Sequence, residues 1–347
     1  MTQINCSRSP VVYILAALVV VLAGGVALWL VLAPSANTLV VYCSHDSVYS
    51  EPIIREFEKR TGIKVEFVPD TEASKSLGLV QRILKEKDKP VCDVFWNNEQ
   101  LGMMDLAKAG VLEIYKGLGW ERMPDRYKHP AGLWTGFAAR MRVWIVNTDY
   151  AEPAPEGIKK VLEGQLSRVG IATPLYGTTR THYTVMWHLW GQEKLKAWHM
   201  EYREGGIIEL PGNGPVARQV GSGTLYVGLT DTDDAFDQID QKKPVALVPV
   251  ELADDHVIVI PNTVAIIKGT KKKDAARKLV DFLLSAEVEL MLADSKARQI
   301  PLGPVDETKL NDDVKKLMPW VAKGYPLGAL DEASEECLEW LKTEYVK

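Results

Sequence analysis

The sequence lacks the motifs by which proteins bind nucleotides. In its 347 residues no G-x-G-x-x-G follows the first expected strand, and no G-x-x-x-x-G-K occurs anywhere. It also lacks a Ser/His/Asp order with a nucleophile elbow, and no Cys/His pair has an activating context. Nucleotide-dependent enzymes and covalent hydrolases therefore have no support in the sequence, and we expect a protein that is not an enzyme.

Cysteine is scarce, with four residues in the whole chain. Cys6 precedes a long apolar run, so it is not the lipid-modified cysteine that normally follows one. Cys43 is expected to end one strand and Cys92 to begin a parallel neighbour, which would hold the two far apart. Because no cysteine spacing resembles a zinc site, we expect neither a Cys43–Cys92 disulfide nor a structural zinc.

Charge is absent from residues 11–33, a run long enough to cross a bilayer core of about 30 Å. Arg8 precedes the run and no acidic residue does, which places the amino terminus in the cytoplasm and everything from about Asn37 outside. The run exceeds the apolar core of most signal peptides, and Pro34 spoils the nearest cleavage site. We therefore favour an uncleaved membrane anchor over a long signal peptide.

Strong charge of one sign is also missing. Without Arg8, the expected exported part holds 40 of the 41 Lys and Arg residues against 46 Asp and Glu residues. Such mild acidity argues against nucleic acid as a partner and offers no basic patch for a lipid surface. The 311 residues left after the first 36 of the 347 are enough for one two-lobed protein.

The hydrophobic periodicity predicts two α/β units. In the first, strands are expected at 39–43, 64–68 and 91–96, with helices beginning near Ser50 and covering 73–87 and 99–109. The second follows a strand at 143–146, with strands at 169–172 and 226–229 and helices at 181–190 and 192–204. A long strand at 257–267, interrupted at Pro261-Asn262, then precedes helices at 273–285 and 286–293.

Two units joined near residues 143 and 260 predict an α/β, two-lobed fold with two crossover strands and a central cleft. One apolar helix would precede it, within residues 1–36. We expect residues 37–142 plus 262–302 to form lobe 1, and residues 143–261 plus 303–347 to form lobe 2.

Polar residues follow four of the expected strands. Ligands of open α/β sheets bind outside the carboxyl ends of the strands, so these segments should line the cleft. The four segments are Ser44-His45-Asp46, Asn97-Asn98-Glu99, Thr173 to Arg180, and Thr230 to Asp234.

Gly177-Thr178-Thr179-Arg180 directly precedes an expected helix. Its backbone N–H groups, hydroxyls and guanidinium would hold an anion at the positive end of the helix dipole. The alternative is a threonine cap with Arg180 in solvent. Arg140 and Arg142, before a crossover strand, would either reach the cleft or form surface salt bridges.

Asp231, Asp233 and Asp234 place three carboxylates within four positions, which suits a hard cation or an amine. Alternatively, Thr232 caps the next helix and the aspartates stabilise its first turn. His45 beside Asp46 would either coordinate a metal or form loop hydrogen bonds. His182 lies in a helical stretch without ligand spacing and is expected to be structural.

Several stretches carry a family resemblance. They are LVVYCSHD at 39–46, EFEKRTGIKVEF at 56–67, DVFWNNEQ at 93–100, DLAKAGVLE at 105–113, ARMRVWIVNT at 139–148, VGIATPLYGTT at 169–179, LYVGLTDTDDA at 225–235, IPNTVAIIKG at 260–269 and AARKLVDFLLS at 275–285. Over residues 39–305 the chain resembles the ferric-iron-type solute-binding proteins of bacterial ABC importers, which are periplasmic binding proteins.

The resemblance implies a ligand set, from which this chain departs at one point. Iron-binding members carry two adjacent tyrosines where this chain has Asp233 and Asp234, so tyrosinate ligation is absent. The family's cleft histidine falls on Asp46 or His45, its cleft glutamate near Asn98 or Glu99, its anion-holding segment on Gly177, Thr178 and Thr179, and its supporting asparagine on Asn213.

These features predict the extracytoplasmic solute-binding component of an ABC importer, with the permease and ATPase subunits as partners. Its ligand would be a metal ion, ferric iron included, bound with a companion anion. Two alternatives stay open: a binder of a small organic or phosphorylated anion or zwitterion, and a membrane-tethered solute sensor without a transport role. In each case we expect the protein to be extracytoplasmic and anchored to the cytoplasmic membrane by residues 11–33.

Overall fold

The structure is a computed structural model that describes residues 38–70 and 76–346. The predicted apolar helix at 11–33 lies outside these residues, so the anchor stays a prediction. Among the described residues, every helix is too short or too polar to cross a membrane.

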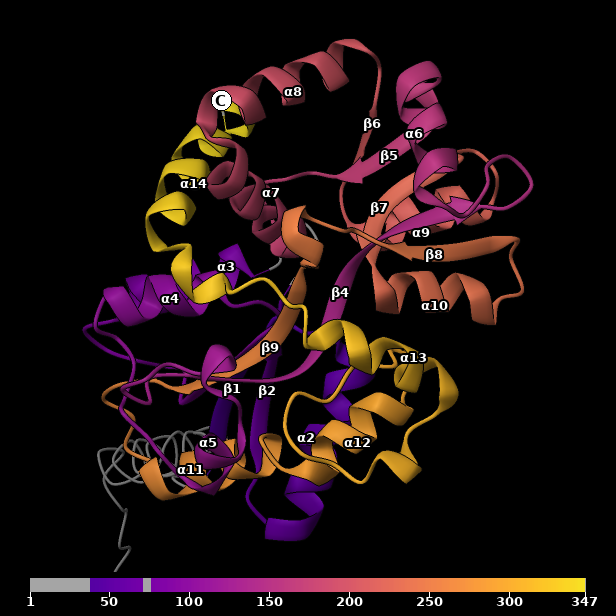
Figure 1. The fold of residues 1–347 in the computed structure, drawn as a ribbon. Helices are drawn as coiled ribbons and strands as arrows, with labels where there is room; N and C mark the ends of the chain where they lie inside the picture. Colours follow the sequence, from indigo (N-terminus) through magenta and orange to yellow (C-terminus); the bar gives the residue numbers. More distant parts are fainter. Residues whose placement is uncertain (1–37, 71–75, 347) are drawn as a thin grey trace, which may run out of the picture. The chain divides into compact units, whose positions relative to one another are not determined.

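Nine strands in the described residues form one mixed sheet (Figure 1). Their order is β2-β1-β3-β9-β4-β7-β5-β6, with β8 also paired to β4. The strands are β1 (Leu39–Cys43), β2 (Val65–Pro69), β3 (Val94–Asn97), β4 (Thr135–Asn147), β5 (Val169–Ala172), β6 (Ile208–Leu210), β7 (Val227–Asp231), β8 (Val245–Pro249) and β9 (Val259–Ile266).

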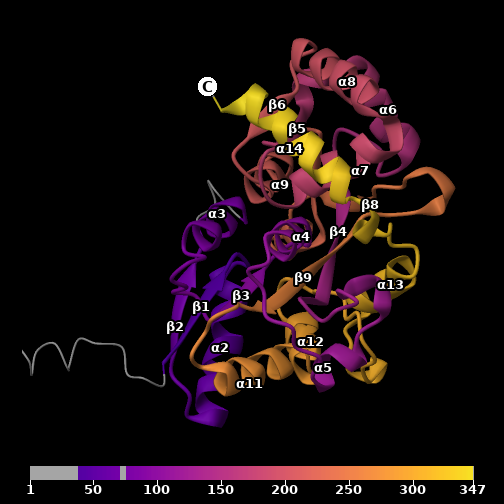
Figure 2. The same ribbon diagram turned by 90° about the vertical axis from the view of Figure 1, so that its left-hand side faces the viewer.

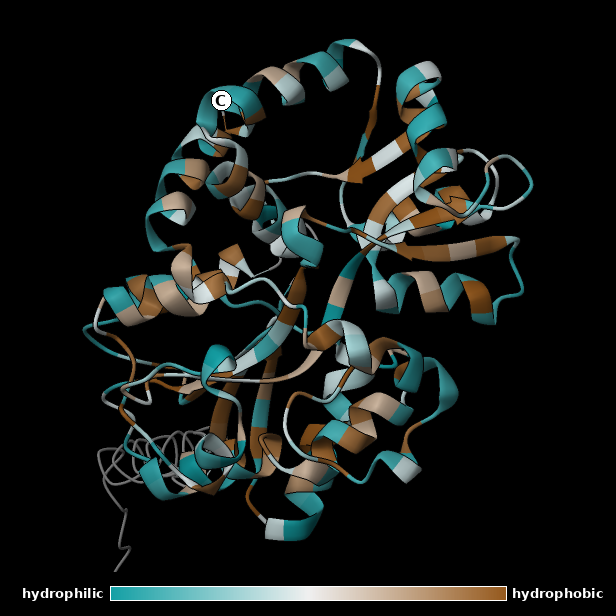
Figure 3. Cartoon of the chain, in the orientation of Figure 1, coloured by the Kyte–Doolittle hydropathy of each residue, from teal (hydrophilic) through white to brown (hydrophobic). Residues whose placement is uncertain are grey.

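Helices flank both halves of this sheet (Figure 2). They are α2 (Ser47–Thr61), α3 (Leu77–Lys85), α4 (Leu101–Lys108), α5 (Leu118–Arg122), α6 (Pro155–Gly164), α7 (Gly177–Trp190), α8 (Gln192–Glu204), α9 (Asn213–Gly221), α10 (Thr232–Asp240), α11 (Lys273–Leu283), α12 (Ala286–Asp294), α13 (Asp312–Val321) and α14 (Asp331–Tyr345). Apolar colour concentrates on the strands and polar colour on the outer helices (Figure 3).

Strands β4 and β9 join the two halves. The first part of β4 pairs with β9, and its last part pairs with β7 and β8. At the changeover Met141 still lies opposite Val259, whereas Arg142 lies opposite Asp231. The predicted two-lobed α/β fold with crossover strands is therefore confirmed.

Both crossover strands differ in extent from the expectation. β4 has 13 residues and begins at Thr135, well before the predicted start. β9 continues through Pro261, because this residue pairs beside an irregularity between Phe137 and Ala139 where the ladder is already broken. The short strand β6 and the half-buried strand β8 were not expected.

The C-terminal tail divides its contacts. Leu310 and Val314 pack on Ala293 of α12, whereas Cys337 and Leu341 of α14 join the apolar cluster around α7. The structure assigns no residue boundaries to the lobes, so the predicted boundaries stay a prediction. Cys43, Cys92 and Cys337 are free and buried.

Gly228 of β7 allows α9 to pack closely on the half of the sheet that contains β5, β6 and β7. A Cβ atom at Gly228 of β7 would lie 2.5 Å from Cγ1 of Val216 on α9. Only a residue without a side chain allows this approach. The close packing fixes the first turn of α9 at the edge of the sheet where β7 ends.

Candidate functional site

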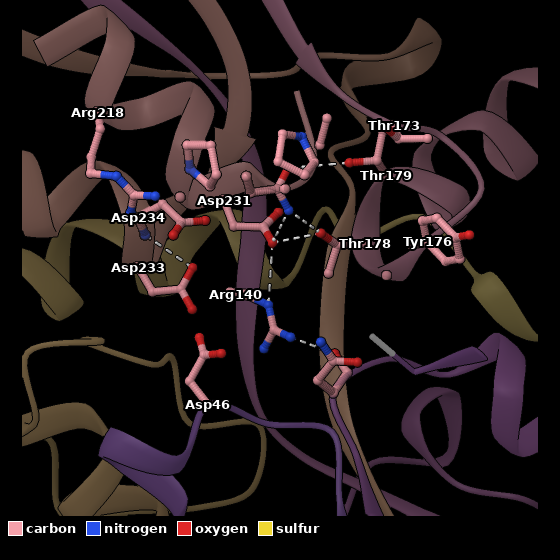
Figure 4. Close-up of a pocket in the computed structure, with 18 residues that line it drawn as sticks. Asp46, Arg140, Thr173, Tyr176, Thr178, Thr179, Arg218, Asp231, Asp233 and Asp234 are labelled. Atoms are coloured by element: carbon pink, nitrogen blue, oxygen red, sulfur yellow. Dashed lines mark hydrogen bonds and ion pairs between the residues drawn. The ribbon is translucent and has the colours of Figure 1, made fainter. Parts of the chain in front are cut away.

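A cavity of about 350 Å³ opens at the carboxyl ends of the strands, between the two halves of the sheet (Figure 4). Asp46 and Asn98 reach it from the ends of β1 and β3, and Arg140 reaches it from β4. The remaining lining residues come from the ends of β5, β6 and β7 and from the helices that follow them. This is the position at which open α/β sheets bind ligands.

Three helices begin at this cavity, because β5, β6 and β7 are mutually parallel and end at the same edge. α7 starts at Gly177, α9 at Asn213 and α10 at Thr232. Neither Tyr176 nor Gly212, the residues before α7 and α9, makes a side-chain cap. The first N–H groups of both helices carry partial positive charge, which suits an anion.

Gly177 adopts a positive φ of 53°, and a Cβ atom there would meet open space. Glycine takes this conformation without steric strain. Its missing side chain also leaves the start of α7 open to the cavity, where Thr178 and Thr179 add hydroxyl groups. Gly177, Thr178 and Thr179 of the predicted anion-binding turn therefore lie together at the cavity, but as the first residues of α7 rather than as a turn before a helix at 181–190.

Asp231 is the centre of a buried hydrogen-bond network. Its Oδ1 accepts from Arg142 Nη1 at 2.7 Å. Its Oδ2 accepts from Thr178 Oγ1 at 2.6 Å and from Asn213 Nδ2 at 3.1 Å, and Arg140 Nε lies 3.4 Å away. With both arginines buried, the carboxylate compensates their charge and fixes the floor of the cavity.

Asp233 and Asp234 stand in the first turn of α10. Asp233 accepts from the N–H of Asp234 at 3.1 Å, and Asp234 accepts from Thr230 Oγ1 at 3.3 Å. Carboxylate oxygens of Asp231 and of these two residues lie within 4.8 Å of one another. Asp46 points toward Asp233 from the other half of the sheet (Figure 4).

The threonine cap, one of the two alternatives for this segment, does not form. Thr232 is the first residue of α10, and its Oγ1 accepts from the N–H of Met141 at 3.2 Å. Thr232 therefore ties α10 to the crossover strand. The two aspartates still lie where the helix dipole stabilises them, so the structural and binding roles remain compatible.

Arg140 balances this acidic group. Burial alone would lower its pKa, but the carboxylates of Asp233 and Asp231 raise it above the usual arginine value. Its Nη2 donates to the carbonyl of Asn98 at 2.6 Å. In the described part of the chain, Arg140 Nη1 and Asn98 Oδ1 are buried without a hydrogen-bond partner.

Nine of the predicted site residues line this cavity. They are Asp46, Asn98, Gly177, Thr178, Thr179, Asn213, Asp231, Asp233 and Asp234. Arg142 lies beneath the floor, fully buried, and contacts Asp231, Thr178 and Asn213.

Three other predicted residues, His45, Glu99 and Arg180, do not line the cavity. His45 is buried with its Nε2 3.2 Å from Gln299 Nε2. Glu99 accepts from the N–H groups of Leu101 and Gly102 and so caps α4.

Arg180, expected at the anion or in solvent, is instead buried. It donates to Asp105 of α4 at 3.2 Å and to Ser334 of α14 at 2.9 Å. Its charge is therefore directed away from the cavity, toward two other helices.

Arg140, Arg218 and Tyr176 line the cavity although the expected ligand set did not include them. Arg140 was open to two interpretations, and its spacing of two from Arg142 is the signal that both face the same side of one strand. Arg218 lies one turn after Gly214 on α9, a helix that was not expected from the sequence.

The sequence matches a known protein family over most of its length. The profile of the family described as bacterial extracellular solute-binding protein matches residues 39–295. The chain belongs to this family. It is 23% identical over 255 residues to iron uptake protein A2 of Synechocystis, covering 66% of this chain and 70% of that protein.

Two solved structures share the fold. Iron-bound HitA of Pseudomonas aeruginosa matches with a TM-score of 0.76 and 20% identity, over 88% of this chain and 99% of HitA. AfuA of Actinobacillus pleuropneumoniae, with fructose-6-phosphate bound, matches with a TM-score of 0.69 and 22% identity, over 89% of this chain and 99% of AfuA. At such identities the likeness shows the fold alone.

Proposed function

We propose that this protein is the solute-binding component of an ABC importer and that it captures a small organic anion carrying hydroxyl or amine groups. One observation carries the proposal. In the cavity, the uncapped N-termini of α7 and α9 and the guanidinium of Arg140 lie near the carboxylates of Asp46, Asp233 and Asp234. A ligand with an anionic end and a hydrogen-bond-donating or cationic end satisfies both groups.

The size and charge of the cavity favour an organic solute over a single ion. A volume of about 350 Å³ equals that of about twelve liquid waters. Asp231 already compensates Arg142 and Arg140. Arg140 and Arg218 line the cavity together with the carboxylates, so the walls offer charges of both signs to a ligand that carries both.

A metal ion with a companion anion is the second candidate. It is supported by the carboxylate oxygens of Asp231, Asp233 and Asp234, which lie within 4.8 Å of one another and are hard ligands. A companion anion at Gly177–Thr179 would share the charge. The relatives support both candidates, since one is named an iron uptake protein and another is described with fructose-6-phosphate bound.

The partners in this proposal are the permease and ATPase subunits of the importer. Membership of the solute-binding family supports them. The anchor at residues 11–33 would hold the protein at the outer face of the cytoplasmic membrane. A membrane-tethered sensor remains the alternative use of the same fold, distinguished by loss of solute uptake on deletion of the gene.

A thermal-shift panel tests the ligand class. Phosphate esters, phosphonates, amino acids, carboxylates, polyamines, ferric citrate and divalent metals are each added to the purified chain. A true ligand at about 100 times its Kd stabilises the folded state by about 2.7 kcal/mol. Stabilisation by organic anions supports the first candidate. Stabilisation by metals alone replaces it with the second, and none by any solute contradicts both.

Replacing Asp233 and Asp234 together by asparagine is expected to weaken binding of an amine-bearing anion about tenfold or more, because two charges facing the amine are lost. Purely anionic analogues should bind as well as before or more tightly. Isothermal titration calorimetry measures both. Asp237→Asn is the matched control, since Asp237 lies on α10 but not in the cavity. Unchanged affinity for the amine-bearing ligand would reduce the two aspartates to helix stabilisers.

A further inference from the structure

A second cavity lies in lobe 2, between its sheet and the helices α7 and α8. Its volume is about 240 Å³. Trp144 and Ile171 line it from β4 and β5, His182 and Met186 from α7, and Trp198 and Tyr202 from α8. None of its lining residues lines the cavity at the strand ends. It is therefore separate from the proposed solute site.

The size of this cavity suits a small aromatic molecule. An apolar cavity of about 150 Å³ stays dry and admits benzene. The larger volume here leaves room for one ring with a substituent.

The walls supply aromatic contacts. The rings of Trp198 and Tyr202 lie 4.4 Å apart between centroids, and Trp190 meets Trp198 edge-on at 5.9 Å. Trp144 completes the aromatic wall from the sheet. Ring pairs attract at such separations in offset or edge-to-face arrangements. An aromatic guest would therefore find partners on several sides.

His182 adds one polar group to this apolar wall. Its side chain is 4% exposed, and among the described residues its Nδ1 has no hydrogen-bond partner. Burial, with a further contribution from Arg142, holds the pKa of His182 well below its usual value. The ring is thus neutral at pH 7, and its nitrogen can accept or donate one hydrogen bond. A buried nitrogen left without a partner is unfavourable, so a polar substituent on the guest would be favoured here.

We propose that this cavity is a second binding site, for a small neutral aromatic molecule with one hydroxyl or N–H group that hydrogen-bonds to the imidazole of His182. Among the described residues that line it, Glu251 is the one with a formal charge, and it is exposed. Aromatic carboxylates should therefore bind less well than phenol.

Phenol and its isostere toluene test the site by calorimetric titration of the full-length chain. Both should bind saturably, with one molecule per chain. In His182→Phe the ratio of toluene Kd to phenol Kd should fall about tenfold, since only phenol loses a hydrogen bond. Met186→Trp, which fills the cavity, should abolish binding of both, and Ile171→Phe fills it from the sheet if Met186→Trp does not fold.

Two results would overturn the proposal. One is a toluene-to-phenol ratio that is unchanged in His182→Phe. The other is phenol uptake that is the same in the filled variant as in the wild type, which would leave a dry packing void. Asp233→Asn/Asp234→Asn should leave phenol affinity unchanged, so this outcome is independent of the solute proposed for the first cavity.

Discussion

Replacing Glu289 by alanine is expected to lower the free energy of unfolding by about 3–5 kcal/mol, because it breaks a buried ion pair and leaves several donors unpaired. Glu289 is fully buried on α12, and its Oε2 lies 2.6 Å from Arg122 Nη2. It also accepts from the N–H groups of Ala138, Leu302 and Gly303. Urea unfolding followed by circular dichroism measures the loss.

The same helix offers a matched control. Glu287 also pairs with an arginine, Arg60, at 2.6 Å, but both side chains are largely exposed. Glu287→Ala should therefore have a far smaller effect, since water and salt already screen an exposed pair. Equal losses for the two variants would show that burial is not what makes Glu289 important.

Glu289 bears on function because its side chain holds the backbone of β4 in place at Ala138. Ala138 has a positive φ of 36° at the irregularity in β4, just before this strand crosses between the halves of the sheet. A non-glycine residue keeps such a conformation only when its surroundings impose it. The hydrogen bond from Ala138 to Glu289 is one such constraint.

The fold could be predicted from sequence where each strand is a short apolar run. The expectation was least accurate at β4, because Arg140 and Arg142 interrupt its apolar pattern. Their charge is compensated by Asp231, which lies 89 residues from Arg142 along the chain. No local window contains that partner, so the strand appeared to begin after the arginines.

The site was predicted best by the rule that ligands of open α/β sheets bind at the carboxyl ends of the strands. That rule brought the segments after β5 and β7 to the cavity, although α7 begins at Gly177 and not near residue 181 as expected. The rule does not tell which neighbouring side chains turn inward. Arg180 was expected to be part of the predicted anion-binding turn, yet it pairs with Asp105 and Ser334, 75 and 154 residues away. Contacts between residues so far apart in the sequence determine where a long side chain points. The local spacing of residues does not reveal them.

Asp231→Ala is expected to lower the free energy of unfolding by about 3–5 kcal/mol and to abolish detectable solute binding. The substitution removes the carboxylate that compensates Arg142, which is fully buried, and Arg140. Thr178 and Asn213 lose the same partner, so the starts of α7 and α9 lose their fixed spacing. Denaturant unfolding and calorimetric titration measure the two effects.

A double variant separates these effects. Asp231→Leu/Arg142→Met replaces the buried pair by apolar side chains, an exchange that is often neutral for stability. It should regain much of the free energy lost in Asp231→Ala. Solute binding should not return, because Thr178 and Asn213 still lack the acceptor that orients them. Recovery of binding together with stability would mean that Asp231 acts on the ligand only by keeping the protein folded.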